Sequence, residues 1–274
     1  MNLVSPPRSL PWTLESLALD RIEIERVRPH EDLFYLLASS SFIESGSDLY
    51  TRNLIEHFAG DDELQEWLAG YWEPEELQHG RALAAYVQRV WPEFDWERGF
   101  AAFWNEYGAS CTNTELEKTR GLELAARCVV ETGTASLYRA LYTIAEEPVL
   151  RELMDLIRAD EVRHYKHFYQ AFRRYREREA IGRTRIVVAV LKRVLEIRDE
   201  DSDVALRHVF AARNPDRDPA DYRSSAAQAR DLLRRHIPAE MTVKMLLKPI
   251  DLPPRLLRVL ERPLTRMTEI LFLH

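Results

Sequence analysis

The sequence predicts an all-α protein, built on a four-helix bundle with one long crossover and followed by additional C-terminal helices. Apolar residues recur at three- and four-residue spacing through most of the first 180 residues, which is typical of helices. Glycine occurs nine times in 274 residues, too seldom for the many turns of a β-barrel or β-sandwich. No apolar stretch approaches the length that crosses a bilayer, so we expect no membrane span.

The first pair of bundle helices is expected before the crossover. Residues 31–59 carry one continuous helical pattern that ends at Gly60, a typical C-terminal cap. Residues 62–91 predict the second helix, which Pro74 kinks or restarts because proline has no backbone N–H to donate. Residues 92–113 are rich in aromatic and turn-forming residues and predict a connection with one short helix.

The second pair of helices follows this connection. Thr114 and Glu117 form a capping box, so we expect the third helix to begin near Thr114 and to run to about Glu146. Pro148 suits the first turn of a fourth helix, which extends to about Glu179. Short links within each pair and a longer link between the pairs predict the chain path of a four-helix bundle.

Three segments organise the chain. We expect an N-terminal extension at 1–30, the bundle at 31–180, and a basic helical extension at 181–274 that packs on the bundle. Prolines divide the last segment into shorter amphipathic helices, which we expect at 184–197, 203–213, 219–236 and 254–272.

Charge and cysteine content narrow the function classes. Residues 1–137 carry a net charge of −13 and residues 138–274 a net charge of +6, which indicates either a basic docking face or solvated helix surfaces. The overall charge of −7 argues against nucleic-acid binding. Cys111 and Cys128 cannot form a disulfide framework, so we expect a cytoplasmic protein.

Each half of the predicted bundle repeats one pattern of metal-binding side chains. A glutamate on the first helix is followed, 30 or 32 residues later, by a Glu-x-x-His motif on the second. The six residues are Glu44, Glu76, His79, Glu131, Glu161 and His164. Glutamate and histidine three residues apart share a helix face, and about 30 residues of antiparallel helix return to the same height.

Packed together, the two halves would gather four carboxylates and two imidazoles, the ligand set of di-iron and di-manganese carboxylate bundles. Two divalent ions would balance the four negative charges. We therefore expect two iron ions as the cofactor, with an iron–manganese or a manganese pair as alternatives, because oxygen and imidazole donors accept both metals.

The same motifs resemble the signatures of a known family. Residues 72–80, WEPEELQHG, resemble the WxxEExxHG signature of acyl-carrier-protein desaturases, soluble members of the ferritin-like di-iron superfamily. Residues 160–164, DEVRH, resemble their DExRH signature. Glu131, with Thr134 three residues later, resembles their third-helix glutamate. The resemblance covers about residues 30–180.

The chain departs from the family pattern at several positions. Pro74 lies inside the first signature, and Tyr165 stands where the family has an acid. The surroundings of Glu44 match the family least, so Glu56 and Asp48 are the alternative ligands on the first helix.

The resemblance also implies supporting residues around the metals. Asp160 would accept a hydrogen bond from His79, and Glu75 would accept one from His164, fixing each ring. The alternative is that both acids are solvated on helix surfaces.

Gly133 and Thr134 lie one turn from Glu131. A glycine within a helix costs about 1 kcal/mol relative to alanine, so we expect either room for dioxygen or substrate beside it or close helix packing. Thr134 would donate a hydrogen bond to an oxygen species at the metals, or to its own helix.

The resemblance implies an O2-activating non-haem di-iron oxidase or oxygenase. It would desaturate or hydroxylate an aliphatic or acyl-type substrate, either a small molecule or a carrier-protein-tethered chain, with an electron donor as a second partner. The alternative is a ferritin-like ferroxidase, a radical-bearing subunit, or a metal-binding protein without enzymatic activity. Arg173, Arg174 and Arg176 are candidates for docking an acidic partner, or for a solvated face or the interface of an expected homodimer.

Overall fold

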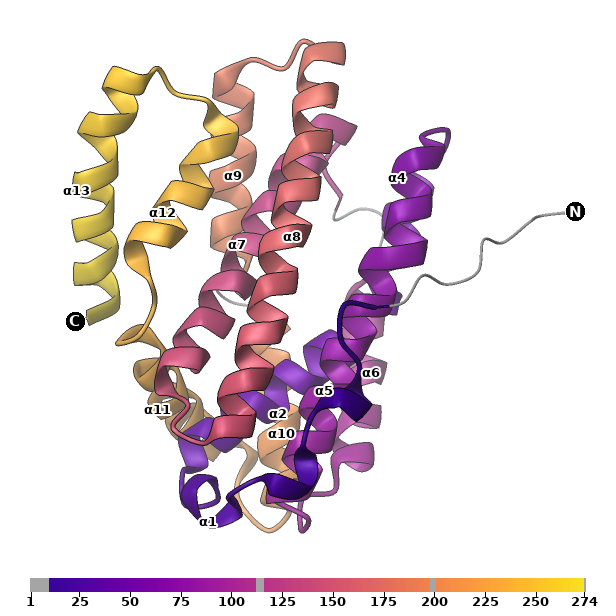
Figure 1. Ribbon diagram of the computed structural model, residues 1–274, viewed down its shortest axis with the longest axis vertical. Coiled ribbons are helices and arrows are strands. Elements are labelled where there is room, and N and C mark those ends of the chain that lie inside the picture. The colour runs from indigo at the N-terminus through magenta and orange to yellow at the C-terminus, as the bar shows by residue number, and fades with distance from the viewer. Residues whose placement is uncertain (1–9, 112–115, 198–200, 274) are drawn as a thin grey trace, which may run out of the picture.

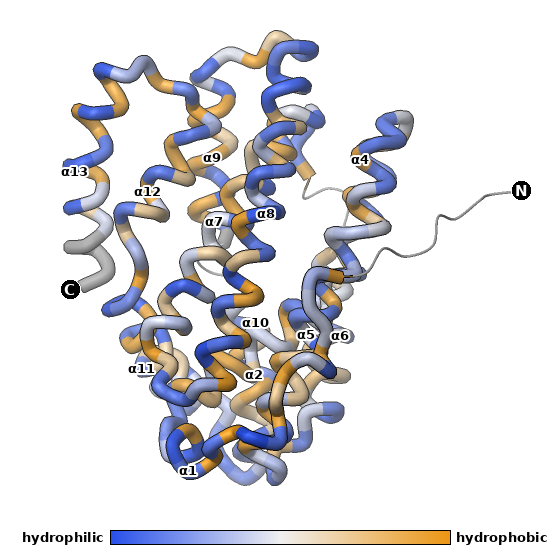
Figure 2. The backbone as a smooth tube through the Cα atoms, in the orientation of Figure 1, coloured by the Kyte–Doolittle hydropathy of each residue, from blue (hydrophilic) through white to orange (hydrophobic). Residues whose placement is uncertain are grey.

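The computed structural model describes residues 10–111, 116–197 and 201–273. Every regular element within these residues is a helix, so the predicted all-α class is confirmed (Figure 1). Within the same residues, no helix combines the length and the apolar character that crossing a bilayer requires. Hydrophobic and hydrophilic residues alternate along the long helices, as amphipathic packing requires (Figure 2).

Four helices position the candidate site. Helix α2 (Glu31–Ser45) packs against α5 (Glu73–Val90), and α7 (Arg120–Ile144) packs along α8 (Pro148–Arg178). Helix α5 also contacts α8, which joins the two pairs. The α8 helix begins as the sequence predicts, because Pro148 occupies its first turn. The Glu147 carboxylate accepts the backbone N–H groups of Val149 and Leu150.

The first predicted helix is divided in two, which corrects the expectation of one helix over 31–59. Helix α2 ends at Ser45, and α3 (Asp48–His57) starts after a break at Gly46. The Gly46 N–H bonds carbonyls of the last turn of α2, and a Cβ at Gly46 would lie 3.3 Å from the Phe103 ring. Serine and glycine have low helix propensity, so these residues favour the end of the helix at this point.

The second predicted helix restarts near Pro74, as expected. Helix α4 (Asp62–Trp67) leads into a π-helical turn, η3 (Leu68–Trp72), and α5 follows with Pro74 in its first turn. Proline is tolerated there because the first turn has no intrahelical acceptor for its missing N–H. Turns of this wide type recur at functional sites, and this one leads into the first turn of α5, which carries Glu75 and Glu76.

The connection between the pairs contains a longer helix than expected, α6 (Trp96–Ser110). Its Trp96 and Phe103 rings pack against Phe42 of α2 at centroid distances of 5.6 Å each, which gives the helix a buried face. Helix α7 starts at Arg120, capped by Thr119, rather than near Thr114, and Thr114 lies outside the described residues.

The two extensions pack on the four helices. Before α2, the chain forms short 3-10 turns η1 (Leu14–Ser16) and η2 (Leu19–Arg21) and a single helical turn, α1 (Ile24–Val27). After α8 come helices close to their expected bounds: α9 (Arg183–Ile197), α10 (Asp201–Arg213), η5 (Pro219–Asp221), α11 (Tyr222–Arg234) and α13 (Pro254–Leu273). Helices α10 and α11 contact α2, and α9 contacts α7.

The sequence did not predict α12 (Ala239–Leu247) or the 3-10 turn η6 (Lys248–Ile250) that follows it. Helix α12 contacts α7 on one side and α13 on the other, so α13 lies at the edge of the molecule (Figure 1).

Candidate metal centre

The six side chains singled out from the sequence converge in the structure. They come from α2, α5, α7 and α8, and each is at most 5 % exposed. They form two groups of four, and in each group one potential ligand atom from every residue lies within 4.8 Å of the others. The first group is Glu44, Glu76, His79 and Glu161, and the second is Glu76, Glu131, Glu161 and His164. Glu76 and Glu161 therefore belong to both groups.

Glu44 occupies the position on the first helix for which the sequence left alternatives. Glu56 is exposed, and Asp48 belongs to neither group of described residues. The break at Gly46 explains the choice, because Asp48 and Glu56 lie on α3, beyond the end of the helix that carries Glu44.

Five buried atoms of the cluster have no hydrogen-bond partner. They are Glu76 Oε1, His79 Nδ1, Glu131 Oε2, Glu161 Oε1 and His164 Nδ1. Each such atom costs about 1–3 kcal/mol when it is left unpaired away from water. The facing atoms are close, with His79 Nδ1 3.2 Å from Glu161 Oε1 and His164 Nδ1 3.0 Å from Glu76 Oε1. The donor set thus fits bound cations, which would satisfy these atoms together.

The other ring nitrogen of each histidine contacts an acid outside the cluster. His79 Nε2 lies 3.0 Å from Asp160 Oδ2, and His164 Nε2 lies 2.7 Å from Glu75 Oε2. Both acids are buried, so they are not solvated surface groups. A carboxylate at Nε2 retains the proton there, so a bound cation would take the place of a proton at Nδ1, which faces the cluster. These are the two contacts that the family resemblance implied.

Two residues that the sequence analysis missed contact the acids that support the histidines. Arg163 donates to Asp160 Oδ1 at 2.6 Å and to Glu75 Oε1 at 2.9 Å, so one guanidinium holds both acids. Trp12 donates its indole N–H to Asp160 Oδ2 at 2.8 Å and stacks on His79 at a centroid distance of 6.1 Å. Arg163 could have been found because it lies within the DEVRH motif, but no local signal marks Trp12.

Two hydroxyl groups orient carboxylates of the cluster. Thr134 Oγ1 donates to Glu161 Oε2 at 2.6 Å, and its contacts with carbonyl oxygens of its own helix are longer. The hydroxyl of Tyr138, on the same helix, donates to Glu44 Oε1. The contacts of Thr134 with its own helix agree with one of the two sequence-based alternatives, whereas its shorter contact with the candidate ligand Glu161 was not expected.

Two glycines near the cluster have different surroundings. A Cβ at Gly80 would lie 2.5 Å from the backbone nitrogen of Ser45, so this glycine lets α5 approach the end of α2 beside Glu44. Gly133 is exposed, with no atom within 4 Å of a Cβ built there. Neither close helix packing nor an enclosed space beside the metals accounts for Gly133.

The ionisation of the cluster follows from its burial. Burial raises the pKa of Glu131 to about 7, and burial together with repulsion from Glu161 raises the pKa of Glu76 well above its usual range. Burial opposes charge on His79 and His164, but the surrounding carboxylates outweigh it and raise the pKa of both imidazoles. The metal-free cluster therefore retains protons that bound cations would displace.

The arginine run at the end of α8 lies apart from the cluster. Arg174 pairs with Glu63 at 2.7 Å and Arg176 with Asp251 at 3.0 Å, while Arg173 is exposed. Two of the three candidate docking arginines are thus engaged within the chain itself.

Comparison with known proteins adds no assignment: no protein-family model matches the chain, and the curated proteins contain no match. The candidate metal centre therefore depends on the residues and their geometry.

Proposed function

We propose that the chain is an O2-activating non-haem di-iron oxidase or oxygenase, with α2, α5, α7 and α8 as a ferritin-like four-helix bundle. The observation that carries the proposal is the pair of overlapping ligand groups that share Glu76 and Glu161. Carboxylates common to two groups would hold two cations together, one in each group.

The donor chemistry favours iron or manganese. The cluster offers four carboxylates and two imidazoles, and no cysteine belongs to either group of described residues. Structural zinc sites prefer thiolates, whereas oxygen-rich sites with one imidazole per ion suit iron and manganese. Four carboxylates also balance the charge of two divalent cations.

Bound iron would supply the capacity to reduce dioxygen and to oxidise an unactivated C–H bond, with electrons from a separate donor. The chain's own residues hold and orient the centre. Asp160 and Glu75 fix the direction of the two imidazole rings, Arg163 holds both acids in place, and Thr134 orients Glu161.

Both extensions cover the helices that carry the centre, which supports a function that requires exclusion of water. On the N-terminal side, Trp12 lies against Asp160 and His79. On the C-terminal side, the Ser136 and Thr242 hydroxyls lie 2.8 Å apart and join α12 to α7. The similarity of the WEPEELQHG and DEVRH motifs to those of acyl-carrier-protein desaturases supports an aliphatic or acyl-type substrate.

The test begins with metal-free protein that is loaded with ferrous ion under anaerobic conditions and then exposed to oxygen. We expect about two iron ions per chain, since one carboxylate–histidine set serves each ion. With long-chain acyl substrates and a reductant, mass spectrometry should find a product that has lost two hydrogens or gained one oxygen.

A matched pair of variants on α8 provides the control. Glu161→Gln should lose metal and oxygen uptake, whereas Glu152→Gln, at an exposed position of the same helix, should retain both. A chain that binds at most one ion, or a Glu161→Gln variant that matches the parent, would contradict the proposal. Rapid turnover of excess ferrous ion with no organic product would instead identify a ferroxidase.

A further inference from the structure

Helix α13 presents an unusual outer face at the edge of the molecule (Figure 1). Its inner face packs through Leu257 and Leu264 against the neighbouring apolar cluster, and the helix contacts α12. The outer face carries a row of exposed arginines at three- and four-residue spacing: Arg255, Arg258, Arg262 and Arg266. This spacing places all four on one stripe of the helix.

A row of exposed apolar side chains follows the arginine row. Each arginine is followed directly by an apolar residue: Leu256, Val259, Pro263 and Met267. Leu256 is 44 % exposed, Val259 66 % and Met267 50 %. Successive residues are about 100° apart around a helix, so the apolar row runs parallel to the arginine row along the same outer face.

Among residues 254–268, the outer face contains no exposed acid to balance the arginines. Across residues 254–268, where the structure describes side-chain exposure, every exposed residue is arginine, proline or apolar. Glu261 is half-buried beside the arginine row, in the groove toward α12, and lies 3.4 Å from Lys244. The described acidic side chains form no ion pair with any of the four arginines of the row.

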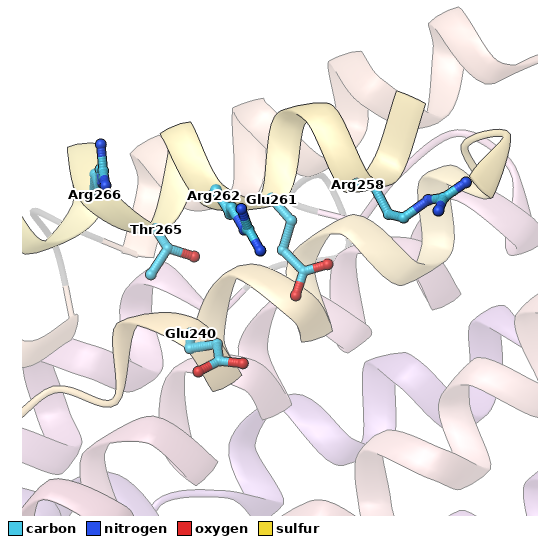
Figure 3. A pocket seen from close by; sticks show the side chains of 6 residues that line it. All are labelled: Glu240, Arg258, Glu261, Arg262, Thr265 and Arg266. Carbon is cyan, nitrogen blue, oxygen red and sulfur yellow. The ribbon is translucent and has the colours of Figure 1, made fainter. Parts of the chain in front are cut away.

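A groove between α12 and α13, about 770 Å³ in volume, borders the arginine row. Arg258, Arg262 and Arg266 line it, and Glu261 and Arg262 reach from α13 toward Glu240 on α12 (Figure 3). Lys244 pairs with both glutamates of the groove, so the positive charge of the arginines exceeds the remaining negative charge.

We propose that the outer face of α13 binds the surface of a bilayer that contains anionic phospholipids. The arginine row would contact lipid phosphates, and the apolar row would enter the boundary between headgroups and acyl chains. Basic and apolar stripes side by side on one helix, lying in the plane of the interface, are the pattern of peripheral membrane helices. This inference does not depend on the proposed di-iron chemistry.

Charge favours an anionic bilayer over a second copy of the chain as the partner of the outer face of α13. A symmetric contact through the outer face would bring one arginine row against another, and the exposed residues of 254–268 include no acid to separate the charges. An anionic bilayer offers phosphates to the arginines and an apolar layer to Leu256, Val259 and Met267 at the same time. Because the chain carries a net charge of −7, an anionic bilayer would repel it overall. Binding therefore requires a local basic face such as that of α13.

The experiment measures co-sedimentation of the full chain with vesicles of phosphatidylcholine, either pure or with about one third phosphatidylglycerol. We expect binding to the anionic vesicles, no binding to the neutral ones, and weaker binding as salt rises. Each arginine near an anionic surface contributes about fivefold to partitioning, so Arg258→Gln with Arg262→Gln should reduce it about 30-fold. Val259→Ser with Met267→Ser should reduce it about tenfold, because less apolar surface enters the bilayer.

The control removes the same charge from another helix. Arg223→Gln with Arg234→Gln, at exposed positions of α11, should leave vesicle binding close to that of the parent. Circular dichroism should show that all variants retain their helices.

Four outcomes would overturn the proposal. They are no binding to anionic vesicles, equal binding to neutral vesicles, an equal loss in the α11 control, and equally tight binding to soluble polyglutamate. A shift from dimer to monomer in the α13 variants, with no vesicle binding by the parent, would show instead that this face joins two copies of the chain.

Discussion

Replacing Glu131 with glutamine should stabilise the metal-free protein and destabilise the metal-loaded protein. Glu131 is 2 % exposed, and burial raises the pKa of its carboxyl from 4.5 to about 7. An acid whose pKa is higher in the folded state favours folding less as pH rises, because the unfolded chain ionises first. The metal-free protein should therefore lose stability from about pH 4.5 up to pH 7 through this residue.

The size of the effect follows from the difference in pKa. A shift of about 2.5 pKa units corresponds to about 3 kcal/mol once the pH exceeds both values. Metal-free Glu131→Gln should thus exceed the metal-free parent by up to about 3 kcal/mol in free energy of unfolding at pH 8. Near pH 4, the Glu131 carboxyl is largely neutral in both the folded and the unfolded protein. The stability advantage of Glu131→Gln should therefore vanish there.

With metal bound, the parent should become more stable than Glu131→Gln. A ligand at 100 times its dissociation constant stabilises the folded state by about 2.7 kcal/mol, and the parent should gain this from ions that Glu131→Gln binds weakly. Urea denaturation at pH 4 and pH 8 with chelator, and at pH 8 with ferrous ion, measures all the required differences.

Glu123 provides the control on the same helix. It is also fully buried, but Arg127 pairs with it at 2.9 Å and, against the effect of burial, lowers its pKa. Glu123→Gln leaves a buried guanidinium without its partner charge and should destabilise the protein by about 3 kcal/mol or more, with or without metal. If Glu131→Gln behaves like Glu123→Gln in chelator, or if metal leaves the order unchanged, the assignment of Glu131 as a ligand is refuted.

Three further substitutions test the surroundings of the centre. Gly80→Ala should lower the free energy of unfolding by about 1–3 kcal/mol because its Cβ overlaps the α2 backbone, whereas Gly70→Ala, which meets no atom within 4 Å, should not show this loss in the same thermal melts. Asp160→Asn should weaken metal binding about 10- to 100-fold in chelator competition with the helices intact, and unchanged affinity would contradict its role. Tyr138→Phe removes the donor to Glu44 and should destabilise the protein by about 1–3 kcal/mol, a cost that urea denaturation should detect.

The sequence by itself was enough for the helical class and for the six residues of the cluster. Helical periodicity is a local property, and Pro148 at the start of α8 is a local signal that the structure follows. The two Glu-x-x-His motifs are local as well, because residues three apart share a helix face whatever the helix packs against. A consistent 30- or 32-residue spacing then placed Glu44 and Glu131 at the same height.

Tertiary structure alone decided which distant groups complete the centre. Trp12 reaches Asp160 across 148 residues, and Arg163 reaches Glu75 across 88 residues, although no periodic pattern links either pair. The first helix ends at Gly46, beside Phe103 of α6, and Glu44 rather than Asp48 belongs to the cluster. Local spacing specifies the face on which a side chain lies, but the element that meets that face depends on the packing of the whole chain.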